Sequence, residues 1–400
     1  MSAHLHKENS QSLKAEAHWG GVIAMTLCVF ALVAAEFMPV SLLTPVSHAL
    51  GVSEGMAGQG ITVSGALAVL TSLFILTVAG SLNRKYVLLG MTGLMALSGL
   101  IIGLAPNYIT YMLGRALIGI AIGGFWSLSA ATAIRLVPER HVARALAIFN
   151  GGNALATVVA PPLGSYLGAA IGWRGAFLSL VPVAVVAFIW QSLTLPAMKE
   201  KRSATQSGNV LYLLKRPLVA TGITGCGLFF MGQFTLFTYV RPFLETVTRV
   251  EISALSLILL AIGIAGFVGT LVIGAFLKRG FYQTLFLIPL FMAAVAGTLM
   301  VFGHATPVVA LLLASWGLVA TAAPVGWWTW VARTMPDDAE AGGGLMVAVV
   351  QMCIALGSVA GGLAFDHSGY RATFTISALL LMASALFTFF TSKFRSQNIS

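Results

Sequence analysis

Charged residues are scarce in this 400-residue chain. Only 8% of its residues are Asp, Glu, Lys or Arg, whereas 58% are hydrophobic. A soluble protein with this composition would lack the polar surface needed to stay dispersed, so a soluble domain is excluded. The net charge of +10 does not indicate a nucleic-acid partner, because the basic residues are spread over many short segments and form no basic face or reading helix.

Cysteine and histidine are scarce as well. The three cysteines, Cys28, Cys226 and Cys353, lie in different apolar runs, which favours small-residue packing over a disulfide or a metal site. All seven histidines lie in tails, loops or the ends of apolar runs. A Walker-type phosphate loop and paired carboxylates at membrane depth are also missing. The sequence therefore predicts no metal site, no cofactor and no enzymatic activity.

The chain has twelve long apolar runs instead. They lie at about 19–43, 59–82, 86–105, 108–132, 146–170, 174–195, 217–240, 253–277, 282–303, 307–332, 341–365 and 370–392. Each run has the roughly twenty residues needed to cross a hydrocarbon core about 30 Å thick. The polar start of the chain has no small-residue cleavage site, so the first run is expected to be retained. The sequence predicts an all-α integral membrane protein with twelve transmembrane helices in a lipid bilayer.

Basic residues alternate between the gaps that separate these runs. Seventeen of the 22 Lys and Arg residues lie in the tails and in every second gap. The intervening gaps hold only Arg174, Arg241, Arg249 and Arg371. Because positively charged loops stay on the cytoplasmic side, both termini are predicted to be cytoplasmic.

The two halves of the chain repeat each other. Segment 172–177 begins Gly-Trp-Arg, and segment 369–374, which lies 197 residues later, begins Gly-Tyr-Arg. Segments 80–85 and 274–279 form a second match at an offset of 194 residues. Two pseudo-symmetric six-helix halves can rock around a site between them, which is the architecture of a carrier. The predicted divisions are a tail at 1–18, a first half at 19–195, a linker at 196–216, a second half at 217–392 and a tail at 393–400.

Two charged residues lie well inside the runs, Glu36 and Arg115. Burying either one costs roughly 2.5 to 3.5 kcal/mol, so such residues tend to be paired and functional. A rise of about 1.5 Å per residue places both in the outer third of the membrane, where they can meet. A carboxyl that moves between wet and dry surroundings changes its affinity for protons, so Glu36 is predicted to carry the coupling proton beside Arg115. A static ion pair and direct contact of Glu36 with substrate are the alternatives.

Amide and aromatic side chains supply a candidate lining for a cavity between the halves. A flat heterocycle stacks on aromatic rings and exchanges hydrogen bonds with amides. Helix packing, interfacial anchoring and lipid contact are the simpler explanations for any one of these residues. The predicted substrate-binding residues are Trp126, Asn150, Asn153, Gln233, Phe234, Trp327 and Gln351.

The fifth run contains two successive prolines, Pro161 and Pro162. Each removes an amide donor, so the pair is predicted to bend or break the helix. Such a bend suits a place where two halves slide past each other.

Several of these motifs resemble those of the major facilitator superfamily, and within it the drug/proton antiporters with twelve spans. Segment 80–85 is similar to the family's loop between helices two and three, although Asn83 stands where an acidic residue is common. Leu113, Gly114 and Arg115 are similar to the helix-four motif whose arginine is implicated in proton transfer. Segment 152–164 resembles the antiporter motif of helix five. The resemblance implies a conformational role for Gly80, Arg84, Lys85, Gly152, Pro161, Pro162 and Gly164.

Segments 36–45, 123–126, 232–242 and 324–330 resemble the group's bacterial purine ribonucleoside exporters. This resemblance implies a proton antiporter of the bacterial inner membrane that exports purine ribonucleosides such as inosine and guanosine by alternating access. A monomer is expected, with a small-molecule substrate and protons as its partners. A sugar or multidrug exporter of the same group is the alternative. A passive channel or a non-transporting membrane sensor is the alternative from another class.

Overall fold

The structure is a computed structural model that describes residues 17–80, 82–138, 141–198, 210–335 and 338–397. The predicted tails and linker fall largely outside these ranges, at 1–16, 199–209 and 398–400. Every regular element in the described part is helical. The all-α fold predicted from the sequence is therefore confirmed.

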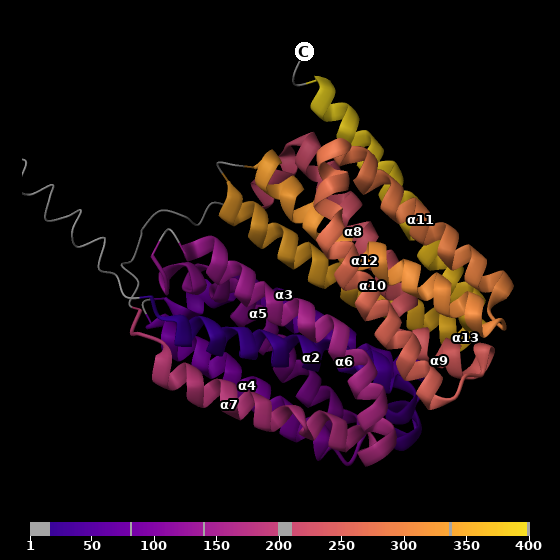
Figure 1. Ribbon diagram of the computed structural model, residues 1–400, viewed down its shortest axis with the longest axis horizontal. Helices are drawn as coiled ribbons and strands as arrows, with labels where there is room; N and C mark the ends of the chain where they lie inside the picture. The colour runs from indigo at the N-terminus through magenta and orange to yellow at the C-terminus, as the bar shows by residue number, and fades with distance from the viewer. Residues whose placement is uncertain (1–16, 81, 139–140, 199–209, 336–337, 398–400) are drawn as a thin grey trace, which may run out of the picture.

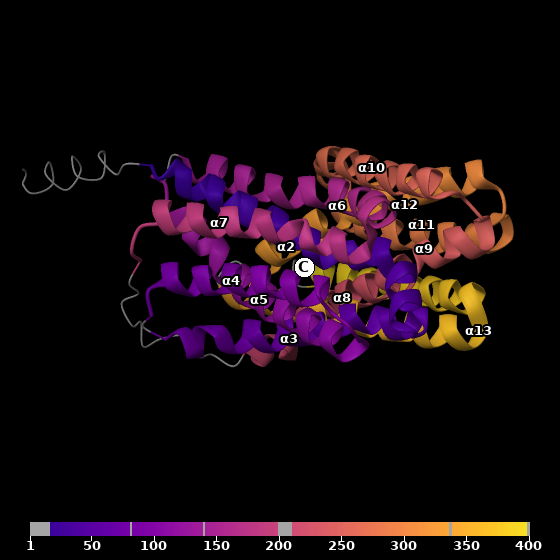
Figure 2. The same cartoon turned by 90° about the horizontal axis from the view of Figure 1, so that it is seen from below.

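The helices form two bundles (Figures 1 and 2). The N-terminal bundle contains α2 (Trp19–Leu50), α3 (Glu54–Ala79), α4 (Arg84–Gly103), α5 (Tyr108–Arg135), α6 (Val142–Leu178) and α7 (Leu180–Thr194). The C-terminal bundle contains η2 (Val210–Lys215), α8 (Pro217–Phe237), α9 (Val240–Phe243), η3 (Leu244–Thr248), α10 (Ile252–Arg279), α11 (Phe281–Phe302), α12 (Thr306–Thr334) and α13 (Ala339–Gln397).

Ten helical stretches in the described residues are long and apolar enough to cross a membrane. Two of them, Gly151–Thr194 with 44 residues and Gly342–Phe394 with 53 residues, have about twice the length of one crossing. Each contains a break at a glycine with positive φ, Gly172 or Gly369. Since each of these two stretches therefore holds two crossings, the described chain has the twelve that the sequence predicts.

The break at Gly369 reverses the direction of the chain. Thr373 Oγ1 donates a hydrogen bond of 3.1 Å to the carbonyl oxygen of Gly361, twelve residues earlier. In a straight helix these residues would lie about 18 Å apart. A left-handed backbone at this point requires glycine, because a Cβ atom would clash with the neighbouring carbonyl.

The internal repeat extends to side-chain packing. Gly172 has φ 77° and Gly369 has φ 74°, at positions 197 residues apart. After each glycine, an aromatic ring packs edge-on against a phenylalanine four residues later, Trp173 against Phe177 and Tyr370 against Phe374. Two pseudo-symmetric halves are thereby confirmed, although Gly274 lies inside α10 and does not end it as Gly80 ends α3.

Helix α6 runs on through both of its prolines, Pro161 and Pro162. The one residue of α6 with non-helical backbone angles is Gly172. The prediction was a bend or a break at the prolines, and the continuous helix excludes the break. Proline's fixed φ near −65° is compatible with a helix, whereas the positive φ at Gly172 is not.

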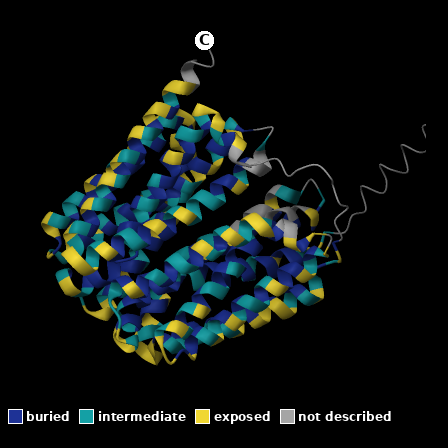
Figure 3. Cartoon of the chain, turned by 180° about the vertical axis from the view of Figure 1, so that it is seen from behind, coloured by how far each residue is buried: buried dark blue, intermediate teal, exposed yellow. Residues whose placement is uncertain are grey.

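The surface suits a lipid surrounding. Buried residues occupy the inside of each bundle, and exposed ones lie along its outer faces (Figure 3). Exposed residues on membrane-spanning helices include Leu70, Phe74, Leu193, Leu271 and Leu311. In water such side chains would be an aggregation hazard, but they are stable in contact with lipid tails.

The described helices of the two bundles lie closest together toward one end. We call the end that carries α9 the α9 end, and the end where α7 stops and α8 begins the linker end. The ribbons of the two bundles lie close together at the α9 end and diverge toward the linker end (Figures 1 and 3). The contacts between α3 and α13, and between α6 and α10, join the two halves.

Candidate functional site between the two halves

A small cavity of about 10 Å³ lies between the bundles. That volume is room for about one water molecule, so a larger solute enters it only when the two halves move apart. Helices α2, α3 and α5 contribute one wall, and α8 and α13 contribute the other. The lining residues are Glu36, Phe37, Val40, Ile61, Ser64, Gly65, Ile122, Phe234, Gln351 and Ile354.

Glu36 is the carboxyl group of this pocket. It lies on α2 and is half-buried. Gln351 Nε2, which comes from α13 in the other half, donates a hydrogen bond of 3.4 Å to Glu36 Oε1. This distance is long for a hydrogen bond, so the contact is weak and easily replaced. The pocket therefore brings the predicted residues Glu36 and Gln351 together across the two halves.

Arg115 lies beside Glu36 but does not form an ion pair with it. The fully buried guanidinium donates through Nε to the carbonyl of Gly60 at 3.1 Å and through Nη1 to the carbonyl of Ala35 at 3.0 Å. Nη2 donates to Ser64 Oγ at 2.9 Å. These three acceptors come from α2 and α3, so Arg115 joins α5 to both helices. Among the described residues, the static Glu36–Arg115 bridge is not formed.

Two phenylalanines face each other across the pocket. Phe37 of α2 and Phe234 of α8 are stacked, with ring centroids 6.0 Å apart and planes inclined by 26°. Phe234 belongs to the predicted set, whereas Phe37 was missed. Phe37 directly follows Glu36 in the sequence, and this position next to a charged residue is the sequence feature that could have identified it.

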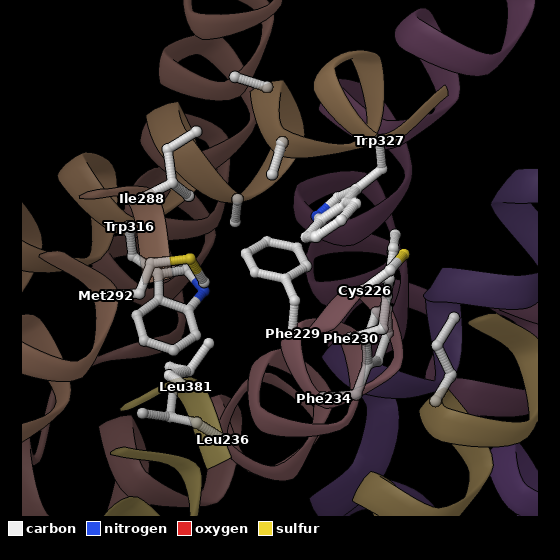
Figure 4. Packing of buried hydrophobic residues seen from close by; sticks show 14 of the residues in the cluster. Cys226, Phe229, Phe230, Phe234, Leu236, Ile288, Met292, Trp316, Trp327 and Leu381 are labelled. Carbon is white, nitrogen blue, oxygen red and sulfur yellow. The ribbon is translucent and has the colours of Figure 1, made fainter. Parts of the chain in front are cut away.

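Trp327 lies away from this pocket lining. It is 3% exposed and packs edge-on against Trp330, with ring centroids 6.1 Å apart. Figure 4 places Trp327 near Phe230 and Cys226 in the core of the C-terminal bundle. In this structure Trp327 is a core residue of one half.

The other predicted lining residues also lie outside the set that lines the pocket. Trp126 is half-buried and packs edge-on against Phe149 inside the N-terminal bundle. Asn153 is half-buried on α6, and the side chain of Asn150 is outside the described part of the structure. Gln233 has its Oε1 buried without a hydrogen-bond partner among the described residues. Such an atom is costly to leave unpaired, which makes it available to a ligand or water.

The loop before α4 is held by a side-chain cap. Gly80 has φ 45° and ends α3, and Asn83 begins α4 by accepting the backbone N–H of Lys85 at 3.1 Å. Asn83 Oδ1 also accepts the backbone N–H of Met198 at 2.8 Å, and Arg84 N donates to the carbonyl of Met198 at 3.0 Å. Asn83 therefore ties the start of α4 to the segment after α7 without needing a negative charge.

Glycines on α6 allow it to lie directly against α2. A Cβ atom on Gly152 would come within 2.4 Å of the carbonyl oxygen of Thr26. One on Gly164 would come within 2.5 Å of Ser41 Oγ. These contacts make both glycines packing residues within one half. Pro161, on the same helix, is buried.

Charged residues not singled out from the sequence close the α9 end. Asp366 of α13 accepts Ser53 Oγ at 2.5 Å through Oδ2 and the backbone N–H of Gly55 at 3.0 Å through Oδ1. Its carboxylate thus caps the first turn of α3, which belongs to the other half. Arg241, predicted to lie in a loop, is 3% exposed and donates through Nη1 to the carbonyl of Ser41 on α2. Its charge is balanced by Glu245, which accepts from Nε at 2.7 Å.

Comparison with known proteins gives relatives over nearly the full chain. The family model described as Major Facilitator Superfamily matches residues 25–350. A Pseudomonas aeruginosa protein named transcription regulatory protein OpdE is 63% identical over 378 residues, which cover 94% of each chain. The purine ribonucleoside efflux pump NepI of Salmonella enteritidis is 40% identical over 372 residues, which cover 93% of this chain and 94% of the pump.

Solved structures agree with the fold. The crystal structure of a D-xylose–proton symporter superposes with a TM-score of 0.76 at 15% identity, covering 93% of this chain and 97% of the symporter. The nucleoside transporter NupG superposes with a TM-score of 0.71 at 15% identity, covering 93% of this chain and 99% of NupG. At such low identity these likenesses concern the fold alone.

Proposed function

Because the chain belongs to the Major Facilitator Superfamily, we propose that it is a proton-coupled exporter of purine ribonucleosides that works by alternating access. Family membership makes it a multi-pass membrane transporter and not an enzyme. The 40% identity to a purine ribonucleoside efflux pump supports the nucleoside as cargo. The observation that carries the proposal is the pocket between the halves, in which one carboxyl and two aromatic rings meet.

Glu36 is the proposed proton carrier. Its carboxyl is shared by the two halves, because it lies on α2 and accepts a hydrogen bond from Gln351 of α13. Arg115 raises the positive potential nearby while its own donors remain bound to protein acceptors. Protonation of Glu36 removes its negative charge and weakens its pairing with the Gln351 amide, so proton binding changes the contact between the halves.

Alternating access requires that the two ends open in turn. The contacts of Asp366 and Arg241 close the α9 end in this structure, and the bundles diverge at the linker end. With the linker end on the cytoplasmic side of a bacterial inner membrane, as the distribution of basic residues predicts, the α9 end that these contacts close faces the opposite side of the membrane. Both termini then lie in the cytoplasm, and a single chain suffices for transport.

Proton entry supplies enough energy for export. Each inward proton carries about 2.3 kcal/mol per 100 mV of membrane potential. With one proton per neutral nucleoside, that energy opposes a gradient of roughly fifty-fold at 100 mV.

The test is the transport of a labelled purine nucleoside into proteoliposomes under an imposed proton gradient. Inosine, arabinose and a lipophilic cation serve as unlabelled competitors. If inosine is the one competitor that inhibits nucleoside accumulation, the proposal is supported. Equal inhibition by all three competitors points to a broad sugar or drug exporter. A failure to accumulate any solute uphill would indicate a channel or a sensor.

A regulatory role is the second candidate, because the 63% identical relative is named a transcription regulatory protein. A transporter alters transcription without touching DNA when it changes the cytoplasmic concentration of an effector. This candidate predicts that the Glu36→Gln variant, which lacks proton-driven uphill transport, loses the transcriptional effect together with net export. Persistence of the transcriptional effect in that variant would require a separate signalling role.

A further inference from the structure

We propose that Gln351 and Glu36 read the hydrogen-bonding edge of a 6-oxopurine base while Phe37 and Phe234 stack on its faces. This inference rests on the proposed function, since it assumes that the cargo is a purine nucleoside. It adds the residues that select the base. Inosine and guanosine carry a 6-oxopurine base, whereas adenosine carries a 6-amino base.

The recognition pair is a donor next to an acceptor. Gln351 Nε2 and Glu36 Oε1 lie 3.4 Å apart at the pocket surface. A 6-oxopurine presents the complementary order on adjacent atoms, with O6 as the acceptor and N1–H as the donor. Adenine presents the reverse order, with a 6-amino donor and N1 as the acceptor. An adenine in the same pose would face its N1 lone pair toward a carboxylate and its amino group toward an amide donor.

The carboxylate is available for such a contact. The nearest cation, Arg115, has donors that are held by Ala35, Gly60 and Ser64. Among the described residues, the hydrogen bond that Glu36 accepts is the 3.4 Å contact from Gln351. A base N–H therefore gains a charge-assisted hydrogen bond with Glu36 and sacrifices only a weak one.

The aromatic pair lies beside this recognition pair. Phe37 directly follows Glu36 on α2, and Phe234 comes from α8 in the other half. Because the two rings belong to different halves, a relative movement of the halves changes their separation. The two rings stack directly on each other at 6.0 Å, so a flat base enters between them only when the halves move apart, and stacking on both rings then stabilises the bound state.

One consequence is that proton uptake at Glu36 weakens base binding. The carbonyl oxygen of the protonated carboxyl still accepts the N1–H of the base, but this hydrogen bond is no longer strengthened by a negative charge. The same side chain that selects the base then also couples its release to proton uptake.

The inference is tested by equilibrium binding to the purified full-length protein in nanodiscs at mildly alkaline pH. The probes are inosine, adenosine and 1-methylinosine, in which a methyl group replaces the N1–H donor. Inosine is expected to bind more tightly than either of the others by about fivefold to 150-fold, the range for one well-formed polar pair. Binding of all three probes with affinities within about threefold of one another would overturn the inference.

A paired substitution supplies a second arm at constant net charge. Glu36→Gln combined with Gln351→Glu exchanges acceptor and donor, so adenosine is expected to become the tighter ligand. Glu36→Gln alone is expected to abolish the preference, whereas the control Glu251→Gln, at an exposed carboxyl before α10, is expected to keep it. An unchanged preference for inosine in the paired variant would contradict the inference.

Size-exclusion profiles and thermal stability establish that each variant is folded. If the paired variant does not fold, the comparison of inosine with 1-methylinosine on the unaltered protein still decides the question. Failure of base selection with intact proton-driven nucleoside transport would leave the proposed function standing. Absence of binding for every nucleoside would overturn both.

Discussion

Asp366→Asn is expected to open the α9 end. Asp366 is an exposed residue of α13 that holds the first turn of α3 in the other half through Ser53 and Gly55. The substitution keeps one oxygen for the Gly55 amide but removes the negative charge and the acceptor for Ser53. The shape of the side chain is almost unchanged, so packing at this interface is preserved.

The expected magnitude follows from these two losses. A hydrogen bond contributes about 0.5 to 1.5 kcal/mol net, and a charge at a helix N-terminus contributes about 0.3 to 1 kcal/mol where solvent screens it. Their sum of about 0.8 to 2.5 kcal/mol corresponds to a shift of about 4- to 60-fold in the equilibrium between closed and open α9 ends.

Distances between spin labels measure this equilibrium. Labels on Pro106 and His304, two exposed residues in turns at the α9 end of different bundles, report its opening. Cys353, which is half-buried, is replaced by serine in the background, whereas Cys28 and Cys226 are buried. Asp366→Asn is expected to populate a longer distance.

Gly55→Ala provides an independent perturbation of the same contact. A Cβ atom there would come within 2.2 Å of Asp366 Oδ2 and 2.8 Å of the Gly362 carbonyl oxygen. Gly90→Ala is the matched control, because a Cβ atom at Gly90 meets nothing within 4 Å. Distance distributions for Asp366→Asn and Gly55→Ala that match those of Gly90→Ala would refute the assignment of this contact as a closure.

Three further predictions concern the scaffold around the pocket. Gly152→Ala is expected to cost about 1 to 3 kcal/mol of stability and so to lower the thermal unfolding midpoint, because the added Cβ meets the backbone of α2. The matched control is Gly151→Ala, which has open space around its Cβ and is expected to leave the midpoint unchanged. Arg115→Lys is expected to lower both the unfolding midpoint and transport, since one ammonium group cannot reproduce three directed donors; unchanged values would contradict this role. Asn83→Ala is expected to cost about 1 kcal/mol in the same unfolding measurement, while Asn83→Asp, which keeps the acceptor, is expected to be nearly neutral.

The twelve crossings and the two halves followed from the sequence because each depends on local pattern. A hydrocarbon core imposes a minimum length on every apolar run, and the repeated Gly-Trp-Arg and Gly-Tyr-Arg segments mark equivalent turns. Gly172 and Gly369 adopt the same left-handed conformation for that reason. The continuous helix through Pro161 was not predictable from composition, since proline disrupts or permits a helix according to its neighbours.

The site was only partly predictable, because a pocket depends on which helix faces meet. Glu36 and Gln351 line the pocket, and their polar side chains inside apolar runs identified them. Phe234 was identified by its place next to Gln233 among clustered aromatic residues. Phe37 shares neither feature, and only its place next to Glu36 distinguishes it from the other phenylalanines of the chain. Trp327 has the same chemistry as a stacking residue but faces the core of its own half, which only the packing of α12 determines.

The partner of Arg115 illustrates the same limit. Depth along the helix placed Arg115 near Glu36, but its donors go to backbone carbonyls of α2 and α3. Carbonyl oxygens within helices normally accept hydrogen bonds from backbone N–H groups of the same helix. The Gly60 carbonyl can also accept from Arg115, because the lack of a side chain at Gly60 lets α5 pack close to α3. Sequence alone gives no information about such an approach.

Proton-driven transport by Glu36→Gln tests the central claim most directly. In proteoliposomes with an imposed proton gradient, the unaltered protein is expected to accumulate nucleoside uphill. The variant is expected to exchange inosine or adenosine down a concentration gradient but to accumulate neither uphill, because an amide does not take up a proton. Uphill accumulation of either nucleoside by Glu36→Gln would contradict the account.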